Sequence, residues 1–137
     1  MSDRSRQILV AAALLIGPDG RALLVRKRGT TVFMQPGGKI DAGETPPAAL
    51  RRELREELAL EIDEADALHM GRFTAPAAHE TDATVVAEVY LLRLSAPVTP
   101  QAEIEEARWV DPADPGPVEL APLTGELIFP AWRLMQP

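Results

Sequence analysis

The apolar positions along the chain form short runs bounded by turn-forming residues, with one longer segment of helical period between them. Runs of this kind, with glycine and proline near their ends, are typical of β-strands. We therefore expect strands at residues 8–16, 22–27, 67–75, 83–94 and 103–112. The sequence GPDG should join the first two strands as a hairpin.

The segment after this hairpin is rich in glycine and is expected to have no regular structure. Residues 28–44 read RGTTVFMQPGGKIDAGE, in which four glycines and one proline interrupt any repeating pattern. Thr45 then suits the N-cap of a helix, and Pro46 suits its first turn. We expect this helix to end near Leu58.

Prolines dominate the C-terminal part of the chain and predict an irregular crossing followed by a short helix. Four prolines should keep residues 111–123 irregular. Residues 123–135 predict a closing helix that Pro130 should kink or split. The order of strands, helix, strands and helix predicts one α/β domain over residues 1–137, with a mixed sheet between helices.

Composition narrows the classes of function. The chain has 137 residues, of which 46% are hydrophobic and 26% charged, as in an ordinary globular domain. A formal net charge of −7 argues against stable binding to nucleic acid or to anionic membranes. The sequence has no cysteine, which excludes disulfides and thiol catalysis and suits the reducing cytoplasm.

The apolar run near the N-terminus resembles the core of a signal peptide, because Arg4 and Arg6 precede it. It has no A-x-A cleavage site and continues directly into a second strand-like segment, so a strand–turn–strand is the better interpretation. No segment approaches the roughly 20 apolar residues that span a bilayer. We therefore expect a cytoplasmic protein.

The predicted helix carries a cluster of glutamates beside its apolar stripe. Leu50, Leu54 and Leu58 form the stripe, which should pack on the sheet. At about 100° per residue, three glutamates fall within an arc of roughly 100° next to it. These glutamates are Glu53, Glu56 and Glu57.

A solvated, ion-paired helix is the ordinary explanation of such charges. Arg52 and Glu56 fit it, because opposite charges four residues apart attract each other. Glu53 and Glu57 instead repel each other at the same spacing, as do two arginines on the far side of the helix. Each like-charged pair costs about 0.2–0.5 kcal/mol, so this explanation leaves the clustered glutamates unaccounted for.

A divalent cation would explain the cluster. Mg²⁺ prefers hard oxygen ligands and is commonly held by carboxylates together with substrate phosphates. Gly37 and Gly38 would let the backbone approach the same ion and the phosphates closely, and Lys39 adds a positive charge beside them. These groups suit the hydrolysis of a phosphoanhydride with Mg²⁺, or alternatively Mn²⁺, as cofactor.

Residues 38–60 match a known pattern. Gly38, five residues, Glu44, seven residues and then RELREELAL fit G-x5-E-x7-R-E-U-x-E-E-x-G-U, the Nudix box, where U is a bulky aliphatic residue. The chain therefore resembles the Nudix hydrolases, MutT-like members in particular, and the resemblance implies an α/β/α sandwich with a mixed central sheet and the Nudix loop–helix–loop. Ala59 departs from the pattern, because the family has a helix-capping glycine there. The alanine should either cost about 1–2 kcal/mol of strain or shift the helix end.

The resemblance assigns roles to the acidic residues. In the family, the glutamates that correspond to Glu53, Glu56 and Glu57 bind the divalent ions and position or deprotonate the attacking water. Glu44 and Arg52 complete the implied catalytic set as a structural pair, in which Arg52 orients the neighbouring carboxylates.

Two further metal ligands are implied by the resemblance. The backbone carbonyl of Gly37 would contact the ion. Family members often supply one more glutamate from a loop outside the box; Glu103 is the first candidate here, and Glu105 and Glu106 compete with it.

Substrate-binding residues are expected close to the box. Arg26, Arg28 and Lys39 could contact phosphates, with both arginines on one face of a strand, although exposed arginines are as often ordinary surface residues. The residues placed to touch the base, or another group attached to the phosphates, are Phe33, Met34 and Gln35. Phe33 could equally belong to the core.

The remaining candidates are expected to be structural. His69 and His79 are expected to be solvated or satisfied by neighbours rather than catalytic. Trp109 and Trp132 are expected in the core or at an interface.

The function that follows is hydrolysis of a pyrophosphate bond in a nucleoside diphosphate linked to another group. A nucleoside triphosphate, cleaved to a monophosphate and pyrophosphate, is the first expectation for the substrate. ADP-ribose and dinucleoside polyphosphates are the alternatives. A Nudix-fold nucleotide-binding regulatory module without turnover, and a plain acidic interaction domain, are the alternatives of another class. A homodimer is a further expectation, because the resemblance includes many dimers.

Overall fold

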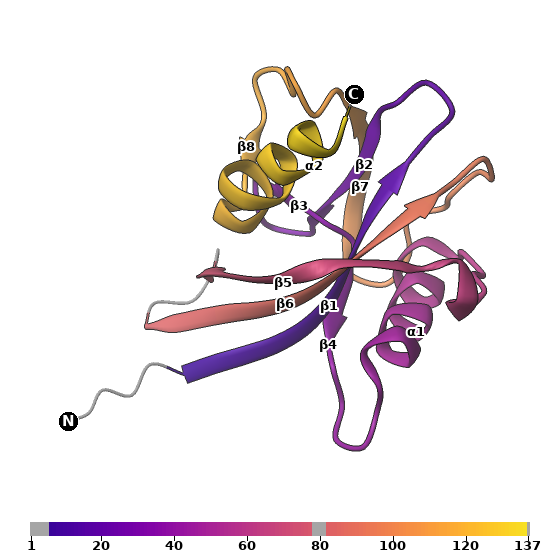
Figure 1. Ribbon diagram of the computed structural model, residues 1–137, viewed down its shortest axis with the longest axis vertical. Coiled ribbons are helices and arrows are strands. Elements are labelled where there is room, and N and C mark those ends of the chain that lie inside the picture. Colours follow the sequence, from indigo (N-terminus) through magenta and orange to yellow (C-terminus); the bar gives the residue numbers. More distant parts are fainter. Residues whose placement is uncertain (1–5, 78–81, 137) are drawn as a thin grey trace.

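A computed structural model describes residues 6–77 and 82–136 of the chain, which build one mixed sheet of eight strands with a helix on each side (Figure 1). The strands are β1 (Arg6–Ile16), β2 (Ala22–Lys27), β3 (Val32–Met34), β4 (Gly37–Lys39), β5 (Leu68–Pro76), β6 (Ala83–Arg93), β7 (Ile104–Val110) and β8 (Glu119–Leu120). The helical segments are α1 (Pro46–Leu58), the 3₁₀ turn η1 (Glu64–Asp66), the π-helical η2 (Leu123–Ile128) and α2 (Phe129–Met135). The predicted α/β class with a mixed sheet is confirmed.

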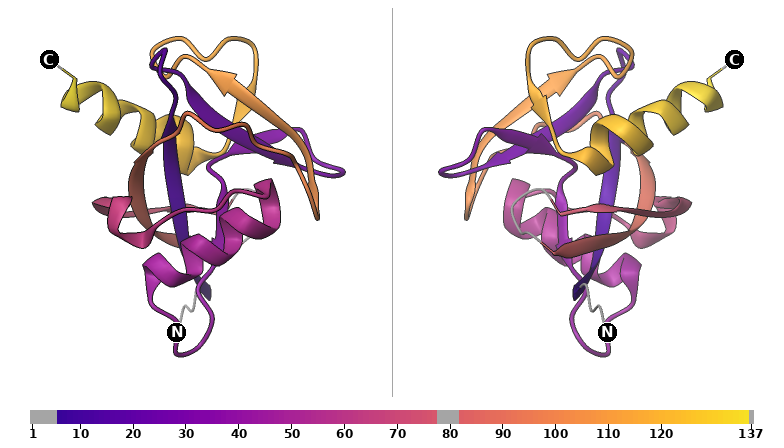
Figure 2. Two further views of the ribbon diagram at one scale, coloured as in Figure 1. Left: turned by 90° about the vertical axis from the view of Figure 1, so that its right-hand side faces the viewer. Right: turned by 90° about the vertical axis from the view of Figure 1, so that its left-hand side faces the viewer.

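The sheet divides into two wings that meet near the turn between β1 and β2. In one wing, β1 pairs in parallel with β6 along its whole length and antiparallel with β4 on its other edge. In the other wing, β2 pairs with β7 and β3. Only Ile16 and Ala22 are paired between β1 and β2, so the predicted hairpin opens directly after its turn. The two views of Figure 2 show the resulting curl of the sheet.

Side chains that alternate along β1 pack into two separate cores. Ala11, Ala13 and Leu15 pack with the leucine stripe of α1, whereas Leu14 and Ile16 pack on the opposite face with η2 and α2. Successive side chains of a strand point to opposite faces, so a run that is apolar at every position is the pattern of a strand covered on both sides. The leucines of α1 have no exposed surface, which confirms the predicted stripe.

Local chemistry fixes the ends of α1 as predicted. The hydroxyl of Thr45 accepts a hydrogen bond from the amide of Ala48 at 3.2 Å. The two residues between them are prolines, which have no N–H to satisfy. At the other end, Ala59 has φ 54° and ψ 34°, and the amide of Leu60 bonds the carbonyl of Leu54. The helix therefore keeps the left-handed cap and places an alanine in the strained conformation.

Two predictions about the irregular segments are wrong. Residues 28–44 contain β3 and β4, because Gly37 and Gly38 pair with Ala12 and Ala11 of β1. A Cβ on Gly37 would overlap the carbonyl oxygen of Ala11, so the lack of side chains permits this strand instead of preventing it. The strand predicted as the last is β7, but β8 follows it inside the proline-rich crossing and pairs with β3.

The predicted closing helix is present, and it changes from π-helical to α-helical just before Pro130 without a break between the two segments. Residues Leu123–Ile128 form the π-helical η2, and Pro130 lies in the first turn of α2, which follows η2 directly. Trp132 is buried in the core beneath α2, so the core is the alternative observed for this residue. Trp109 is partly buried against the other core.

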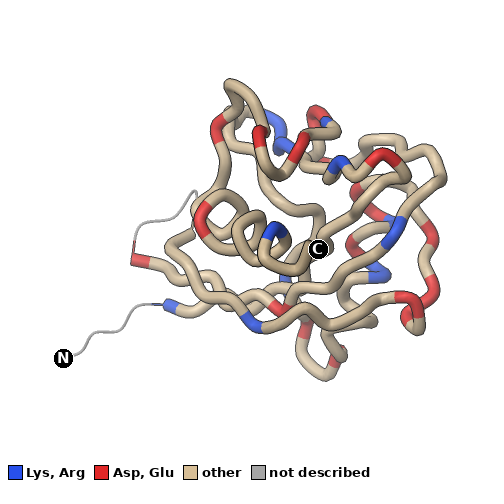
Figure 3. Tube along the Cα trace, turned by 45° about the horizontal axis from the view of Figure 1, so that its top comes forward, with Lys and Arg blue, Asp and Glu red and all other residues tan. Residues whose placement is uncertain are grey.

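The surface carries both signs of charge. Figure 3 shows basic positions scattered among more numerous acidic ones in that view. Of the helices in residues 6–77 and 82–136, none combines the length and the apolar character that crossing a membrane would require.

Candidate functional site

The acidic residues of α1 lie where the helix meets β4. Glu57 is buried with 3% of its surface exposed, and the side chain of Glu53 is 15% exposed. The side chain of Glu56 is 55% exposed. The three glutamates therefore range from the protein interior to solvent along one edge of the helix.

Glu57 is the buried member. Its Oε1 accepts a hydrogen bond from the amide of Gly37 at 3.1 Å. Burial raises the pKa of Glu57 to about 8, the bond from Gly37 opposes that shift, and the nearby charge of Glu53 adds to it. A carboxyl in this position is costly to ionise unless a cation arrives beside it.

Glu53 lies against the backbone of Gly38. A Cβ added to Gly38 would sit 2.5 Å from Oε1 of Glu53, so only glycine leaves room for this carboxylate. Burial raises the pKa of Glu53, although Arg52 opposes the shift. Each of the two glycines of β4 thus lies against one carboxylate of α1, that of Glu57 for Gly37 and that of Glu53 for Gly38.

Arg52 holds the outer part of the cluster together. Its Nε and Nη2 donate to the two oxygens of Glu44 at 2.8 and 2.9 Å, and its Nη1 donates to Oε2 of Glu53 at 2.8 Å. The same guanidinium reaches the carbonyl of Lys39 at 3.0 Å and approaches Glu56 at 3.7 Å. The paired, charge-assisted bonds from Arg52 lower the pKa of Glu44 to about 2. This geometry fits the role predicted for the pair.

The loop before β7 brings Glu103 towards the same place. The amide of Gln101 donates to the carbonyl of Glu57 at 2.8 Å, and the amide of Arg28 donates to the carbonyl of Glu103 at 2.8 Å, which anchors the loop between α1 and β2. The charge of Glu103 contributes to the raised pKa values of both Glu53 and Glu57. Glu103 itself pairs with Lys27 at 3.5 Å.

The two competitors of Glu103 have other partners. Glu105 pairs with Arg28 at 3.3 Å, and Glu106 pairs with Arg26 at 3.3 Å and with Arg108 at 2.8 Å. The arginines expected to bind phosphates are therefore engaged by glutamates of β7. Arg28 also lies beyond the end of β2, after a shift in register at Arg26 and Lys27, so the expected common face of the two arginines is not formed.

A pocket lies on the other side of β4. It has a volume of about 180 Å³ and runs from Lys27 past β4 towards η2. Apolar side chains of β1 and β6 form its floor, and Gly37, Gly38 and Lys39 form part of its wall. The pocket and the acidic cluster are therefore separated only by the three residues of β4.

The three residues expected to touch the base have different positions. Met34 and Gln35 line the pocket. Phe33 does not line it; this side chain is 5% exposed and packs in the core beneath Arg108, whose guanidinium lies 4.9 Å from the ring centroid. The core alternative for Phe33 is the one observed, because β3 turns it away from the pocket.

His69 does not join the cluster. His69 contacts Glu88 at 2.8 Å on the β5–β6 wing, where its side chain is half exposed. His79 lies outside the described residues.

Sequence reasoning missed two groups of residues. Lys27, which lines the pocket and pairs with Glu103, continues the alternation of Leu23 and Val25, which face α1; this period-two pattern could have identified it. Ile8, Val10 and Thr124 also line the pocket, but they come from opposite ends of the chain and no local pattern joins them.

A divalent cation needs suitable ligand atoms and enough space beside them. Glu53 and Glu57 offer hard carboxylate oxygens beside backbone that carries no side chain, and burial raises the pKa of both groups, so a cation beside them would favour their ionised forms. Within residues 6–77 and 82–136, no three acidic or histidine side chains converge as a closed metal cluster, and Arg52 pairs with Glu53 and approaches Glu56. The residues fit the ion in type and location.

Two curated proteins match part of this chain in sequence. The chain is 38% identical over 73 residues to an 8-oxo-dGTP diphosphatase from Haemophilus influenzae, covering 50% of this chain and 54% of that protein. It is 45% identical over 47 residues to an RNA pyrophosphohydrolase from Halorhodospira halophila, covering 34% of this chain and 26% of that protein. The aligned parts thus span about half or less of these relatives.

The fold and the family are shown by two further matches. The crystal structure of a MutT/nudix family protein from Enterococcus faecalis superposes with a TM-score of 0.77 over 98% of this chain and 64% of that one, at 18% identity, and shows the same fold. The NUDIX domain matches residues 6–129, which is most of the chain. The chain therefore belongs to the NUDIX domain family.

Proposed function

We propose that this chain hydrolyses a phosphoanhydride bond of a nucleoside triphosphate, giving a nucleoside monophosphate and pyrophosphate. One observation carries the proposal: the carboxylates of Glu53 and Glu57 and the pocket lie on the two sides of Gly37 and Gly38. A substrate with its base in the pocket and its phosphates along β4 would meet the acidic cluster at the phosphates.

The metal belongs to the acidic side in this proposal. Glu53, Glu56 and Glu57 would hold Mg²⁺ or Mn²⁺, with the carbonyl of Gly37 and the carboxylate of Glu103 as additional ligands. When bound, the ion supplies Lewis-acid polarisation of the phosphate and a more acidic water.

The other residues of the cluster position these ligands. Arg52 keeps Glu44 ionised and holds Glu53 at the edge of the helix. Burial raises the pKa of Glu57 to about 8 in the metal-free protein, so Glu57 would release its proton when the ion binds beside it. Lys27 and Lys39 line the pocket beside the glycines and supply positive charge for the phosphates.

The names of two relatives support nucleotides as the substrate class. One is an 8-oxo-dGTP diphosphatase and the other an RNA pyrophosphohydrolase. The net charge of −7 and the small pocket favour a free nucleotide over a long RNA. We further propose that the protein acts in a reducing compartment such as the cytoplasm, which the lack of cysteine suits.

A hydrolysis panel tests the proposal. Folded protein with millimolar Mg²⁺, and separately Mn²⁺, is assayed for pyrophosphate and phosphate release from the natural nucleoside triphosphates, 8-oxo-dGTP, ADP-ribose, dinucleoside polyphosphates and 5′-triphosphorylated RNA. We expect pyrophosphate release from at least one nucleoside triphosphate. Inactivity on every substrate would favour a binding module, and activity confined to ADP-ribose or the dinucleotides would replace the proposed substrate. Light scattering at micromolar concentration tests the homodimer, which a monomeric mass would remove.

A further inference from the structure

One wall of the pocket carries a buried polar pair. The hydroxyl of Thr124, in η2, donates to Oε1 of Gln35 at 2.6 Å, although 89 residues separate the two in sequence. Gln35 is 5% exposed and Thr124 has no exposed surface. Both residues line the pocket.

This bond leaves the other end of the amide unpaired. Nε2 of Gln35 is buried and has no hydrogen-bond partner in the described part of the chain. An amide nitrogen can only donate, and the hydroxyl of Thr124 has already engaged the accepting oxygen. Buried polar groups are nearly always paired, so an unpaired donor in a pocket wall points to a ligand that accepts from it.

The surroundings limit what that ligand can be. Ile8, Val10, Val85 and Leu123 make the rest of this part of the pocket apolar. A volume of about 180 Å³ is below the roughly 300–1,000 Å³ of pockets that enclose a whole drug-sized ligand. The pocket therefore suits one flat ring system, with any attached phosphates outside it along β4.

We infer that Gln35, oriented by Thr124, selects a base that presents a carbonyl oxygen to its amide nitrogen. The inference rests on the proposed function, because it takes the base of the nucleotide to be the group that enters the pocket. A base that presents an amino group at the same ring position would bring two donors together and leave both unpaired. Rejection of this kind exceeds what an apolar pocket alone achieves between bases of equal shape.

Binding of three purine nucleoside 5′-monophosphates tests the inference without turnover. Inosine monophosphate has a carbonyl at the six position, adenosine monophosphate an amino group, and purine riboside monophosphate only hydrogen. Dissociation constants are measured by calorimetry in chelator, with wild-type protein. We expect inosine monophosphate to bind about tenfold more tightly than purine riboside monophosphate, and adenosine monophosphate to bind no better than the latter.

Three variants assign the preference to the polar pair. Gln35→Leu should reduce the ratio between the inosine and adenosine ligands to about twofold or less. Thr124→Val should also reduce it, because the amide is then free to turn its oxygen to the ligand, whereas Thr124→Ser keeps the hydroxyl and should keep the ratio. Thermal melts establish that each variant is folded.

The outcomes separate this inference from the proposed hydrolysis. Equal affinities in the wild type, tighter binding of the adenosine ligand, an unchanged ratio in folded Gln35→Leu, or no binding of any probe at millimolar concentration would each overturn the inference. A protein that hydrolyses nucleoside triphosphates but shows no such preference would refute the inference alone. A protein with the preference but no hydrolysis would support the inference and refute the proposed function.

Discussion

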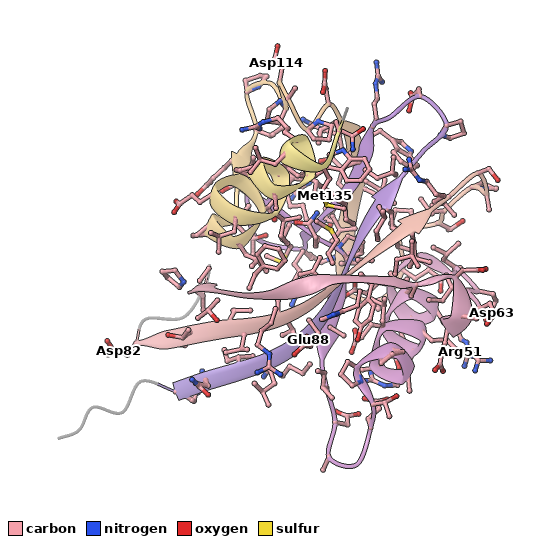
Figure 4. All side chains as sticks on the ribbon, in the orientation of Figure 1. Arg51, Asp63, Asp82, Glu88, Asp114 and Met135 are labelled. Atoms are coloured by element: carbon pink, nitrogen blue, oxygen red, sulfur yellow. The ribbon has the colours of Figure 1, made fainter. Side chains whose placement is uncertain are left out.

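The two sides of helix α1 differ in how far their charged side chains are exposed to solvent. On the side away from the sheet, Arg51 and Arg55 are about half exposed and pair with Glu64 at 3.9 Å and Glu61 at 2.9 Å. Figure 4 shows Arg51 pointing away from the sheet at the outer surface of α1. On the side facing β4, Glu57 is buried, and a backbone amide rather than a cation is its hydrogen-bond partner.

The difference separates charges that serve solubility from charges that serve a site. Exposed pairs such as Arg55 with Glu61 contribute roughly 0–1 kcal/mol, and they also offset the repulsion expected between the two arginines. Burying the carboxyl of Glu57 beside Glu53 works against folding, since its pKa rises to about 8. Stability alone would favour an apolar side chain at this position, so the acid is better explained by a cation that it binds.

The largest expected effect concerns the stability of the metal-free protein at different pH values. The folded pKa of Glu57, about 8, lies above the ordinary value of 4.5, so its proton is kept on folding. Stability from this group is full below about pH 4.5 and is lost as pH rises to about 8, by an amount on the order of 5 kcal/mol. Glu57→Gln should lack this loss. Denaturant unfolding in chelator at pH 5 and pH 9 measures it.

The matched comparison isolates Glu57 from the other acids. Because the remaining ionisable groups are the same in both proteins, the difference in unfolding free energy should be small at pH 5 and should favour the variant at pH 9. A variant less stable than wild type at both pH values would show that the ionised carboxylate holds the fold together.

The next effect is on turnover. Glu57→Gln, or Glu56→Gln, should slow hydrolysis about a hundredfold or more at saturating substrate, because a loss of roughly 3 kcal/mol of metal-mediated stabilisation has that consequence. The control is Arg55→Gln on the opposite side of the helix, which should stay within about twofold of wild type. Equal rates in all of these proteins would refute the metal role.

A smaller effect should follow from Gly38→Ala. Its Cβ would meet the carboxylate of Glu53, which is the movable end of a side chain, so the fold should tolerate the change while the carboxylate shifts. We expect turnover to fall about tenfold, equivalent to about 1.4 kcal/mol, with a nearly unchanged melting temperature. A collapse of stability in step with activity would mean that Gly38 serves the fold instead.

The smallest effect concerns the departure from the family pattern. Ala59 has φ 54°, so Ala59→Gly should relieve strain and raise the free energy of unfolding by about 0.5–1 kcal/mol, after allowing for the greater freedom of glycine in the unfolded chain. Activity should be unchanged. A destabilised variant in urea unfolding would show that the alanine side chain contributes packing that outweighs the strain.

Much of the fold could be predicted from local patterns. The strand runs, the N-cap at Thr45 and the stripe of leucines depend on neighbours in sequence, and each is found where it was expected. The missed strands form by pairing with segments distant in sequence. Strand β4, for example, pairs with β1, which approaches so closely that Gly37 has no room for a side chain. Pairing between distant segments leaves no local signal.

The candidate site shows the same division. The clustering of the carboxylates along one edge of α1 follows from helix geometry, whereas the pairing of Arg52 with Glu44 was implied by the family resemblance. The role of Lys27, and the engagement of Arg26 and Arg28 by β7, depend on how β2 meets a strand some 80 residues away. The contact of Gln35 with Thr124 is equally remote and no sequence rule predicts it.

Stabilisation by magnesium tests the central claim, that the acidic side of α1 binds a divalent cation. Thermal melts of wild type and Glu57→Gln at pH 8 are compared in chelator and across a Mg²⁺ titration. Wild type should gain stability in a saturable way, by about 2.7 kcal/mol at a hundred times the dissociation constant, and the variant should gain much less. Folded wild-type protein that shows no saturable gain, or a variant that gains as much as wild type, would contradict the account.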